Sequence, residues 1–212
     1  MVRLRGTVDP VATLYDLKPG FQALLRPTAG RLVRAGLTAN AVTLAALALS
    51  AAEGAALALQ PAASWPFFVL PLVLLVRMAL NALDGLMARE HGQASRLGAV
   101  LNEAGDMAAD LALYLPFALA PGVEPGLAVA AAAGAVATEL AGLAAQSAGG
   151  ARRYDGPMGK SDRALVYGAV ALALGFGTPA HPWLNVVLAA ILLLELATVI
   201  RRVRRAGPEA RP

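Results

Sequence analysis

The sequence contains no cysteine, so disulfide bonds and thiol-ligated metal sites are excluded. It contains two histidines. His91 lies in a polar turn and His181 precedes a proline, and neither has a partner side chain at a regular spacing, so we interpret both as solvated loop residues. The first residues, MVRLRGTVDPVATLYDLKPGF, lack the apolar run that follows the arginines of a secretory signal peptide. No internal repeat is visible.

Apolar residues, by contrast, are abundant and come in long blocks. They make up 58% of the 212 residues, and the mean hydropathy is +0.60. Blocks of about 20 apolar residues are long enough to cross the hydrocarbon core of a bilayer. The sequence therefore predicts an all-α integral membrane protein, a bundle of six transmembrane helices. The expected spans are 41–60, 66–89, 97–120, 124–146, 163–179 and 183–200.

Basic residues are present in every second connector between these spans. The connectors QPAASWP, APGVEPG and GTPAHPW contain no Lys or Arg, whereas the 89–96 turn, the 147–163 loop and both ends of the chain are basic. Cytoplasmic loops of membrane proteins carry an excess of Lys and Arg. We therefore expect a multi-pass protein of a bacterial inner (plasma) membrane with both termini in the cytoplasm. The even number of spans agrees with this topology.

The first 36 residues form a separate amphipathic segment. Apolar residues recur near helical spacing between residues 11 and 36, among several basic residues. We expect a helix on the anionic inner leaflet, interrupted near Pro27, and prefer this to a soluble cap over the cytoplasmic loops. The chain then divides into a cytoplasmic surface segment (1–36), a transmembrane domain (37–200) and a basic cytoplasmic tail (201–212).

Residues 81–106, NALDGLMAREHGQASRLGAVLNEAGD, place a polar stripe in this apolar chain. Asp84 lies three residues after Asn81, and Asp106 lies four residues after Asn102, so each pair shares one face of a helix. The short polar turn between the two segments predicts an antiparallel hairpin. Asp84 is then level with Asn102, and Asn81 is level with Asp106. Carboxylates inside apolar helices are costly, which favours a functional role.

Four facing oxygen-bearing side chains suit a hard divalent cation such as Mg²⁺ or Mn²⁺. Gly85, Ala88 and Gly98 are small enough to let a bulky group approach the backbone. Arg89 adds a fixed positive charge suited to phosphate. The pattern indicates a metal-diphosphate site at the inner surface of the membrane.

These residues resemble the CDP-alcohol phosphotransferase signature, D-x2-D-G-x2-A-R-x8-G-x3-D-x3-D. Six positions match at the required spacing: Asp84, Gly85, Ala88, Arg89, Gly98 and Asp106. The first and third aspartates of the signature are replaced by Asn81 and Asn102. The six spans and the N-terminal surface helix are also similar to that family. Within GLTANAVT, the resemblance places Asn40 and Thr43 where the family approaches the nucleotide.

The resemblance implies roles for the acidic residues. In the family the four acids hold divalent metal at the CDP diphosphate, and the last, here Asp106, deprotonates the acceptor hydroxyl. We accordingly take Asp84 and Asp106 as catalytic and metal-binding residues, with Asn81 and Asn102 as neutral ligands. Two amides in place of acids favour one metal ion over two. Glu103 and Asp110 lie on the same helix stripe as Asp106 and are either auxiliary ligands or packing contacts.

Further charges lie outside the signature. Lys160 and Arg163, at the start of the fifth span, are expected to bind the phosphate of the acceptor or of the lipid. For Arg152 and Arg153 we favour the ordinary basic charge of a cytoplasmic loop over a phosphate contact. Four intramembrane charges are expected to pair inside the bundle, although Arg77 is also placed to extend the site because it lies four residues before Asn81. These four are Glu53, Arg77, Glu139 and Glu195.

The resemblance implies an integral-membrane transferase of phospholipid biosynthesis. It would move a phosphatidyl group from a CDP-activated lipid, CDP-diacylglycerol, to an alcohol acceptor and release CMP. Its partners would be membrane lipids and a second copy in a homodimer, with no nucleic acid. The spacing N102-x3-D106-x3-D110 also resembles the diphosphate motif of UbiA-like prenyltransferases, but no later span carries paired aspartates. A third alternative is a degenerate, non-catalytic lipid-binding member of the first family.

Overall fold

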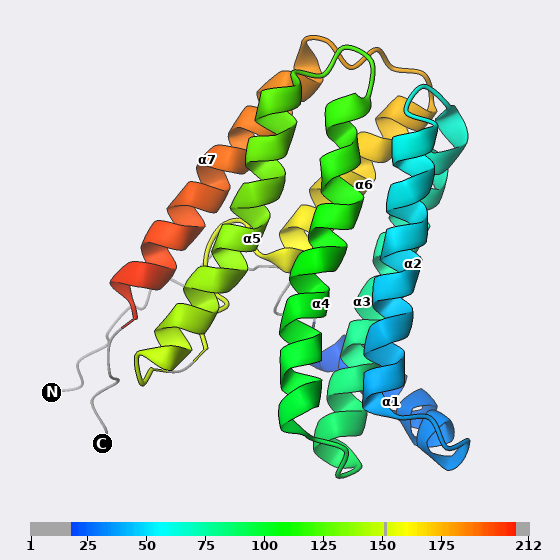
Figure 1. The fold of residues 1–212 in the computed structure, drawn as a ribbon, viewed down its shortest axis with the longest axis vertical. Coiled ribbons are helices and arrows are strands. Elements are labelled where there is room, and N and C mark those ends of the chain that lie inside the picture. Colours follow the sequence, from blue (N-terminus) through cyan, green and yellow to red (C-terminus); the bar gives the residue numbers. More distant parts are fainter. Residues whose placement is uncertain (1–17, 151, 207–212) are drawn as a thin grey trace, which may run out of the picture.

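The computed structural model describes residues 18–150 and 152–206, and in these residues the chain is entirely helical. Within these residues, seven α-helices and one short 3-10 helix form a bundle (Figure 1). Their bounds are α1 Lys18–Arg34, α2 Ala39–Leu59, α3 Ser64–Glu90, α4 Arg96–Tyr114, η2 Leu115–Leu119, α5 Pro125–Ser147, α6 Lys160–Gly175 and α7 Trp183–Arg204. Each of the six spans expected from the sequence corresponds to one of the helices α2 to α7, with η2 extending α4.

Four of the described helices, α2, α3, α5 and α7, are long and apolar enough to cross a membrane. The other two expected spans do not meet that description. The helix α4 carries four charged side chains, and α6 has only 16 residues and begins with KSDR. Four of the six expected spans are therefore candidate membrane spans by length and composition, and the count of six stays a prediction. The shortfall has a physical cause, since α4 and the start of α6 carry the polar residues described below.

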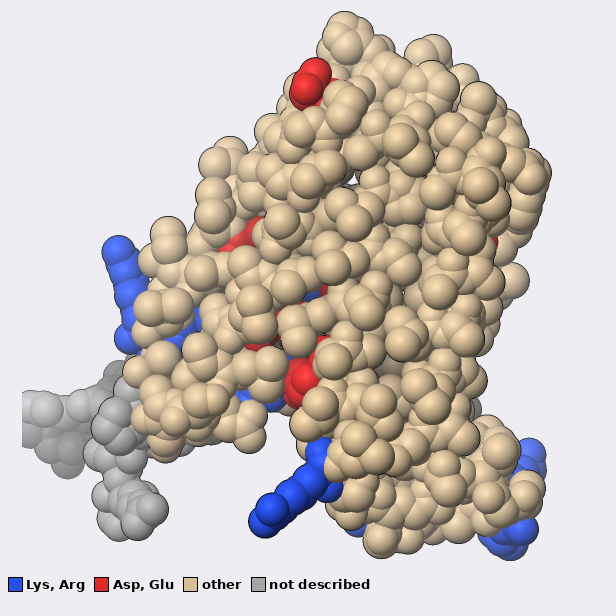
Figure 2. All heavy atoms as spheres, in the orientation of Figure 1, with Lys and Arg blue, Asp and Glu red and all other residues tan. Residues whose placement is uncertain are grey.

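The two kinds of connector lie at opposite ends of the bundle (Figure 1). The α3–α4 turn, the α5–α6 loop, α1 and the end of α7 lie at one end, and the three connectors without Lys or Arg lie at the other. On the face drawn in Figure 2, the basic side chains gather toward the first of these ends. The expected alternation is thus confirmed as a spatial separation of charge. We call this end the basic end.

The helix α1 runs from Lys18 to Arg34 without a break at Pro27, so the expected interruption is wrong. Proline in a helix interior removes one backbone hydrogen bond. The helix packs against α3. The Arg26 guanidinium donates to both carboxylate oxygens of Glu90, at 2.7 and 2.9 Å. This hydrogen-bonded, oppositely charged partner raises the pKa of Arg26. The part of the amphipathic segment before residue 18 lies outside the described residues.

The α2 and α4 helices approach each other backbone to backbone. A Cβ atom added to Gly54 of α2 would overlap the carbonyl oxygen of Ala112 in α4. Glycine is therefore the residue that permits this contact. The close approach brings the polar face of α4 near the start of α2. The large apolar core includes Tyr114 and Tyr167, whose rings stack with centroids 3.9 Å apart.

Candidate active site

The polar stripe forms two levels of contact between α3 and α4. Asn81 Nδ2 donates to Asp106 Oδ1 at 2.8 Å. Asn102 Nδ2 donates to Asp84 Oδ2 at 3.4 Å. The pairing expected from the hairpin is thereby confirmed, because each aspartate meets the asparagine of the opposite helix. The geometry follows from the helical repeat and from the short turn that joins the helices.

Asp84 is buried, with 3% of its surface exposed. Thr43 of α2 donates its hydroxyl to Asp84 Oδ2 at 2.7 Å. The second carboxylate oxygen, Oδ1, is buried and accepts no hydrogen bond from the described residues. Within those residues no basic side chain forms an ion pair with Asp84. A buried carboxylate oxygen without a hydrogen-bond donor is uncommon in folded proteins, and a bound cation or water would satisfy it.

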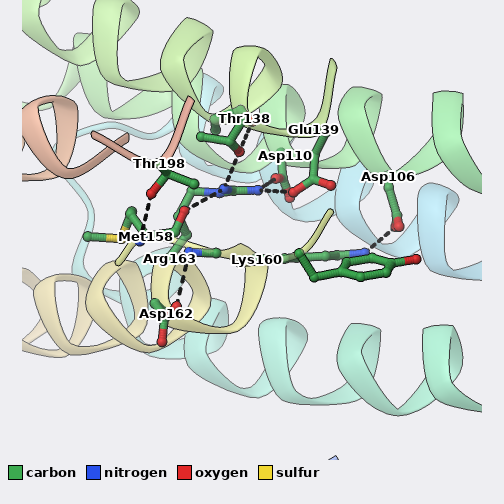
Figure 3. Close-up of polar contacts among 12 residues, drawn as sticks. Asp106, Asp110, Thr138, Glu139, Met158, Lys160, Asp162, Arg163 and Thr198 are labelled. Carbon is green, nitrogen blue, oxygen red and sulfur yellow. Dashed lines mark hydrogen bonds and ion pairs between the residues drawn. The ribbon is translucent and has the colours of Figure 1, made fainter. Parts of the chain in front are cut away.

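Asp106 has a different environment. Its side chain is 22% exposed, and Lys160 of α6 forms an ion pair with Oδ1 (Figure 3). Arg77 Nη2 lies 3.7 Å from the same oxygen and donates to the Asp106 carbonyl at 2.9 Å. Arg77 therefore contacts Asp106, as its spacing from Asn81 suggests, and its role in a functional site stays a prediction. Asp106 is accessible and paired, whereas Asp84 is buried and unpaired.

Deeper in the bundle, Asp110 lies between two arginines. Arg77 Nη1 donates to Asp110 Oδ1 at 2.6 Å, and Arg163 Nη2 donates to Asp110 Oδ2 at 2.8 Å. Arg163 has no exposed surface. It also donates to Glu139 at 3.0 Å and to the Thr138 hydroxyl at 2.8 Å (Figure 3). The structure therefore places Asp110 and Arg163 in an internal ion network, and their predicted roles as a metal ligand and a phosphate contact stay predictions.

Glu103 of α4 and two arginines of the α5–α6 loop also have partners. Arg152 lies 2.5 Å from Glu103 and 3.1 Å from Glu139. Arg153 donates to the carbonyl of Arg205 at 2.9 Å. Glu103 thus faces an arginine, which makes it a packing contact in this arrangement and leaves its role as a ligand a prediction.

The expectation that all four intramembrane charges pair inside the bundle is partly wrong. Arg77 and Glu139 pair as described. Among the described residues no ion pair involves Glu53 or Glu195, and both side chains have a buried carboxylate oxygen without a hydrogen-bond partner. Glu195 packs against Gly134 of α5, where an added Cβ would overlap its carboxylate.

The small residues of the signature lie where side chains leave no room. A Cβ on Gly98 would lie 2.7 Å from Asn40 Oδ1, and one on Gly85 would lie 2.9 Å from the Arg89 guanidinium nitrogens. Ala88 packs against the smaller apolar cluster at the basic end. Asn40 and Arg89 therefore lie directly over the glycines of α4 and α3. These two side chains occupy the space over the glycines in this structure, and the approach of a bulky group to the backbone stays a prediction.

Sequence reasoning missed the way in which α7 holds the loop before α6. Arg202 is 1% exposed and donates to the carbonyls of Asp155 at 3.1 Å and Tyr154 at 3.2 Å, and also to that of Thr138. Thr198 accepts a hydrogen bond from the Met158 N–H at 3.0 Å. The sequence places Arg202 in the basic tail. Its only sequence signal for an inward role is its position one helical turn after Thr198, on the same face of α7.

The donor set at the two levels fits one divalent cation. No group of three or more His, Cys, Asp or Glu side chains gathers at metal-binding distance in residues 18–150 and 152–206. The unsatisfied Oδ1 of Asp84 nevertheless provides an anionic oxygen. Asn102, which contacts Asp84 Oδ2, and Asn81, which contacts Asp106, would supply neutral amide oxygens. A Mg²⁺ or Mn²⁺ ion accepts few protein ligands when phosphate oxygens and water complete its shell.

The surface of the bundle is hollowed at the basic end (Figure 2). Figure 2 shows acidic and basic side chains within a hollow at this end, surrounded by residues of other types.

A family model described as CDP-alcohol phosphatidyltransferase matches residues 36–200. The chain belongs to the CDP-alcohol phosphatidyltransferase family. The matched range includes both levels of the Asp84–Asp106 cluster and the loop before α6. This membership favours the first sequence interpretation over the UbiA-like alternative.

Two relatives in the family are similar over nearly the whole chain. The inner membrane protein YnbA of Escherichia coli (strain K12) is 48% identical over 194 residues, which cover 91% of this chain and 95% of the relative. The phosphatidylinositol phosphate synthase of Mycolicibacterium smegmatis is 32% identical over 206 residues, which cover 91% and 89%. The chain is therefore a multi-pass membrane protein of a transferase family, and a homologue of an inner membrane protein.

Solved structures show the same fold. The crystal structure of the Mycobacterium tuberculosis phosphatidylinositol phosphate synthase with CDP-DAG bound has a TM-score of 0.72 at 23% identity, covering 90% of this chain and 98% of that one. The same enzyme in complex with manganese and citrate has a TM-score of 0.70 at 23% identity, covering 88% and 92%. At this level of identity the likeness establishes the architecture of the family member described here.

Proposed function

We propose that this protein transfers a phosphatidyl group from CDP-diacylglycerol to an alcohol and releases CMP. The observation that carries the proposal is the face-to-face arrangement of Asp84, Asn102, Asn81 and Asp106 at the basic end of the bundle, with one Asp84 oxygen unsatisfied. Family membership and the nucleotide-lipid bound by the mycobacterial homologue support it. The basic end faces the cytoplasm in this proposal, as the positive-inside rule predicts.

Asn81 and Asn102 stand where the family signature has aspartate, and they divide the site into two unlike halves. Asp84 and Asn102 would hold one Mg²⁺ or Mn²⁺ ion, which would neutralise charge on the nucleotide diphosphate when bound. The manganese complex of the mycobacterial homologue supports this choice of ion. Thr43 orients Asp84 by donating to its other oxygen. The nucleotide approaches the backbone at Gly85 and Gly98. Arg89 lies over Gly85, Asn40 lies over Gly98, and Ala88 follows Gly85 in α3.

Asp106 takes the proton of the acceptor hydroxyl. It is the member of the cluster best suited to this role because its side chain is 22% exposed, whereas Asp110 is 2% exposed and bound by two arginines. A general base must lie within hydrogen-bond reach of the proton that it removes. Lys160 is 26% exposed beside it and can contact an anionic acceptor. Asp110 and Arg163 act as structural partners in this proposal.

The test is a CMP-release assay on the full-length protein purified in detergent. Wild-type protein with CDP-diacylglycerol, Mn²⁺ or Mg²⁺ and a panel of alcohols is expected to release CMP, and mass spectrometry of the lipid product then identifies the acceptor. Asp84→Asn, which keeps the shape of the side chain, is expected to lower the rate about 100-fold or more. Glu124→Gln removes a carboxylate at the opposite end of the bundle and is the matched control.

The assay also separates an enzyme from a degenerate lipid-binding relative. A wild-type protein that binds CDP-diacylglycerol but releases no CMP with any acceptor, while Asn81→Asp with Asn102→Asp releases it, would contradict the proposal. We further propose a homodimer, which the family resemblance suggests and which the apolar outer faces of the bundle permit. Cross-linking in native membranes tests this point independently of turnover.

A further inference from the structure

The two aspartates of the site differ in how their charge is balanced. Asp106 contacts an ammonium group, that of Lys160, and has the Arg77 guanidinium 3.7 Å away. Asp84 contacts only uncharged donors in the described part of the chain, the Thr43 hydroxyl and the Asn102 amide. Its Oδ1 oxygen has no donor at all there. One carboxylate thus has its cation supplied by the protein, and the other does not.

We infer that Lys160 is a built-in cation that takes the place of a second divalent ion. One ion binds at Asp84, and the Lys160 ammonium balances Asp106. This inference rests on the proposed function, because the ion is the one that neutralises the diphosphate there. It goes further by assigning the positive charge at Asp106 to a side chain from α6.

The structure holds Lys160 in place from two directions. It is the first residue of α6. The preceding backbone is fixed by the Met158 N–H, which donates to Thr198 at 3.0 Å, and by the Gly159 N–H, which donates to Asp162 at 2.9 Å. The chain therefore enters α6 in one conformation, and Figure 3 shows the Lys160 side chain extended toward Asp106.

A divalent ion at Asp106 would meet opposing charge. It would have to displace the Lys160 ammonium, and it would lie near Arg77, whose guanidinium is committed to Asp110 at 2.6 Å. The neighbouring Asn81 offers no negative charge in return. Like charges at contact distance repel strongly where water is partly excluded. At Asp84 no such repulsion arises from a contacting side chain of the described residues.

The experiment measures Mn²⁺ binding, without substrate, to the purified full-length protein in detergent. Electron paramagnetic resonance of free Mn²⁺ gives both the number of ions and their affinity. Wild-type protein is expected to bind one ion. Asp84→Asn is expected to weaken binding about tenfold or more, as loss of a ligand does. The charge-neutral double variant Asp106→Asn/Lys160→Gln is expected to keep one ion with less than a tenfold change.

Lys160→Gln alone leaves Asp106 without its ammonium partner. We expect this variant either to bind a second Mn²⁺ ion or to bind the first about tenfold more tightly. Wild-type protein that binds no ion or two ions overturns the inference. So does a tenfold or greater loss in the double variant, or unchanged binding in Lys160→Gln. Glu124→Gln, far from the site, is the control and is expected to match the wild type.

The design separates this inference from the proposed function. Binding is read without turnover, so one ion in a protein that releases no CMP supports the charge arrangement and counts against the function. Release of CMP by a protein that binds two ions supports the function and overturns the charge arrangement. Size-exclusion chromatography and thermal melting establish that each variant is folded, and the double variant carries the test if Asp84→Asn is not.

Discussion

Thr198 of α7 accepts a 3.0 Å hydrogen bond from the backbone N–H of Met158, two residues before Lys160. The contact links the last long helix to the entrance of α6. The backbone at Gly156 lies against the same threonine, with φ +138, in a region that glycine adopts readily and other residues avoid. The position of the Lys160 ammonium therefore depends on the Thr198 hydroxyl, which lies outside the site.

Thr198→Val is expected to loosen the loop and to lower CMP release by about tenfold, the usual cost of a lost neutral hydrogen bond at a positioning residue. Valine keeps the shape and removes the acceptor. Thr198→Ser keeps the hydroxyl and should restore the rate. Measurement of kcat and of the KM for each substrate checks this. A displaced Lys160 is expected to raise the KM for the acceptor before it changes the KM for CDP-diacylglycerol. Equal rates for the valine and serine variants would contradict the prediction.

Asp110→Ala is expected to destabilise the fold by about 3–5 kcal/mol, because it leaves Arg77 and Arg163 buried without their shared carboxylate. Thermal melting in detergent measures the loss. Asp155→Ala is the control, since its carboxylate pairs with exposed arginines of α7 and such surface pairs contribute at most about 1 kcal/mol. Similar melting temperatures for the two variants would show that the internal network contributes little.

Gly54→Val is expected to prevent the close contact of α2 with α4, because the added side chain would overlap the Ala112 carbonyl. Overpacking of this kind costs about 1–3 kcal/mol or more. A lower melting temperature together with reduced Mn²⁺ binding is the expected result, because Thr43 and Asn102 approach Asp84 from these two helices. Gly20→Val, in a position with open space around it, is the matched control.

Asn81→Asp is expected to place a second carboxylate against Asp106, where the asparagine now donates a hydrogen bond. Repulsion between the two should lower the melting temperature in EDTA, and added Mn²⁺ should raise it again. Asn185→Asp serves for comparison, because Asn185 accepts a hydrogen bond from the Glu124 N–H through an oxygen that aspartate retains. A melting temperature of Asn81→Asp that rises with Mn²⁺ no more than that of the wild type would contradict the prediction.

The sequence predicted the helix order and the two levels of the hairpin because both depend on local rules, the apolar period and the 3.6-residue turn. Asn81 opposite Asp106 is the direct consequence of a short antiparallel connection. The partners of Asp110 were not predictable, since Arg77 and Arg163 lie 33 and 53 residues away and meet it only through the packing of α3 and α6 on α4. The inward role of Arg202 escaped prediction for the same reason, because its partners are backbone carbonyls of a loop and of α5.

The ribosome makes the members of the ion network in a fixed order. Arg77 of α3 precedes Asp110 by 33 residues, so this arginine is synthesised before the carboxylate that it binds. Arg163 follows 53 residues later, and Lys160 belongs to the same late helix. In a nascent chain that ends after α5, the described ion pairs of Asp106 and Asp110 would be limited to those with Arg77. Arrival of α6 is the step that makes the charges of this centre complete.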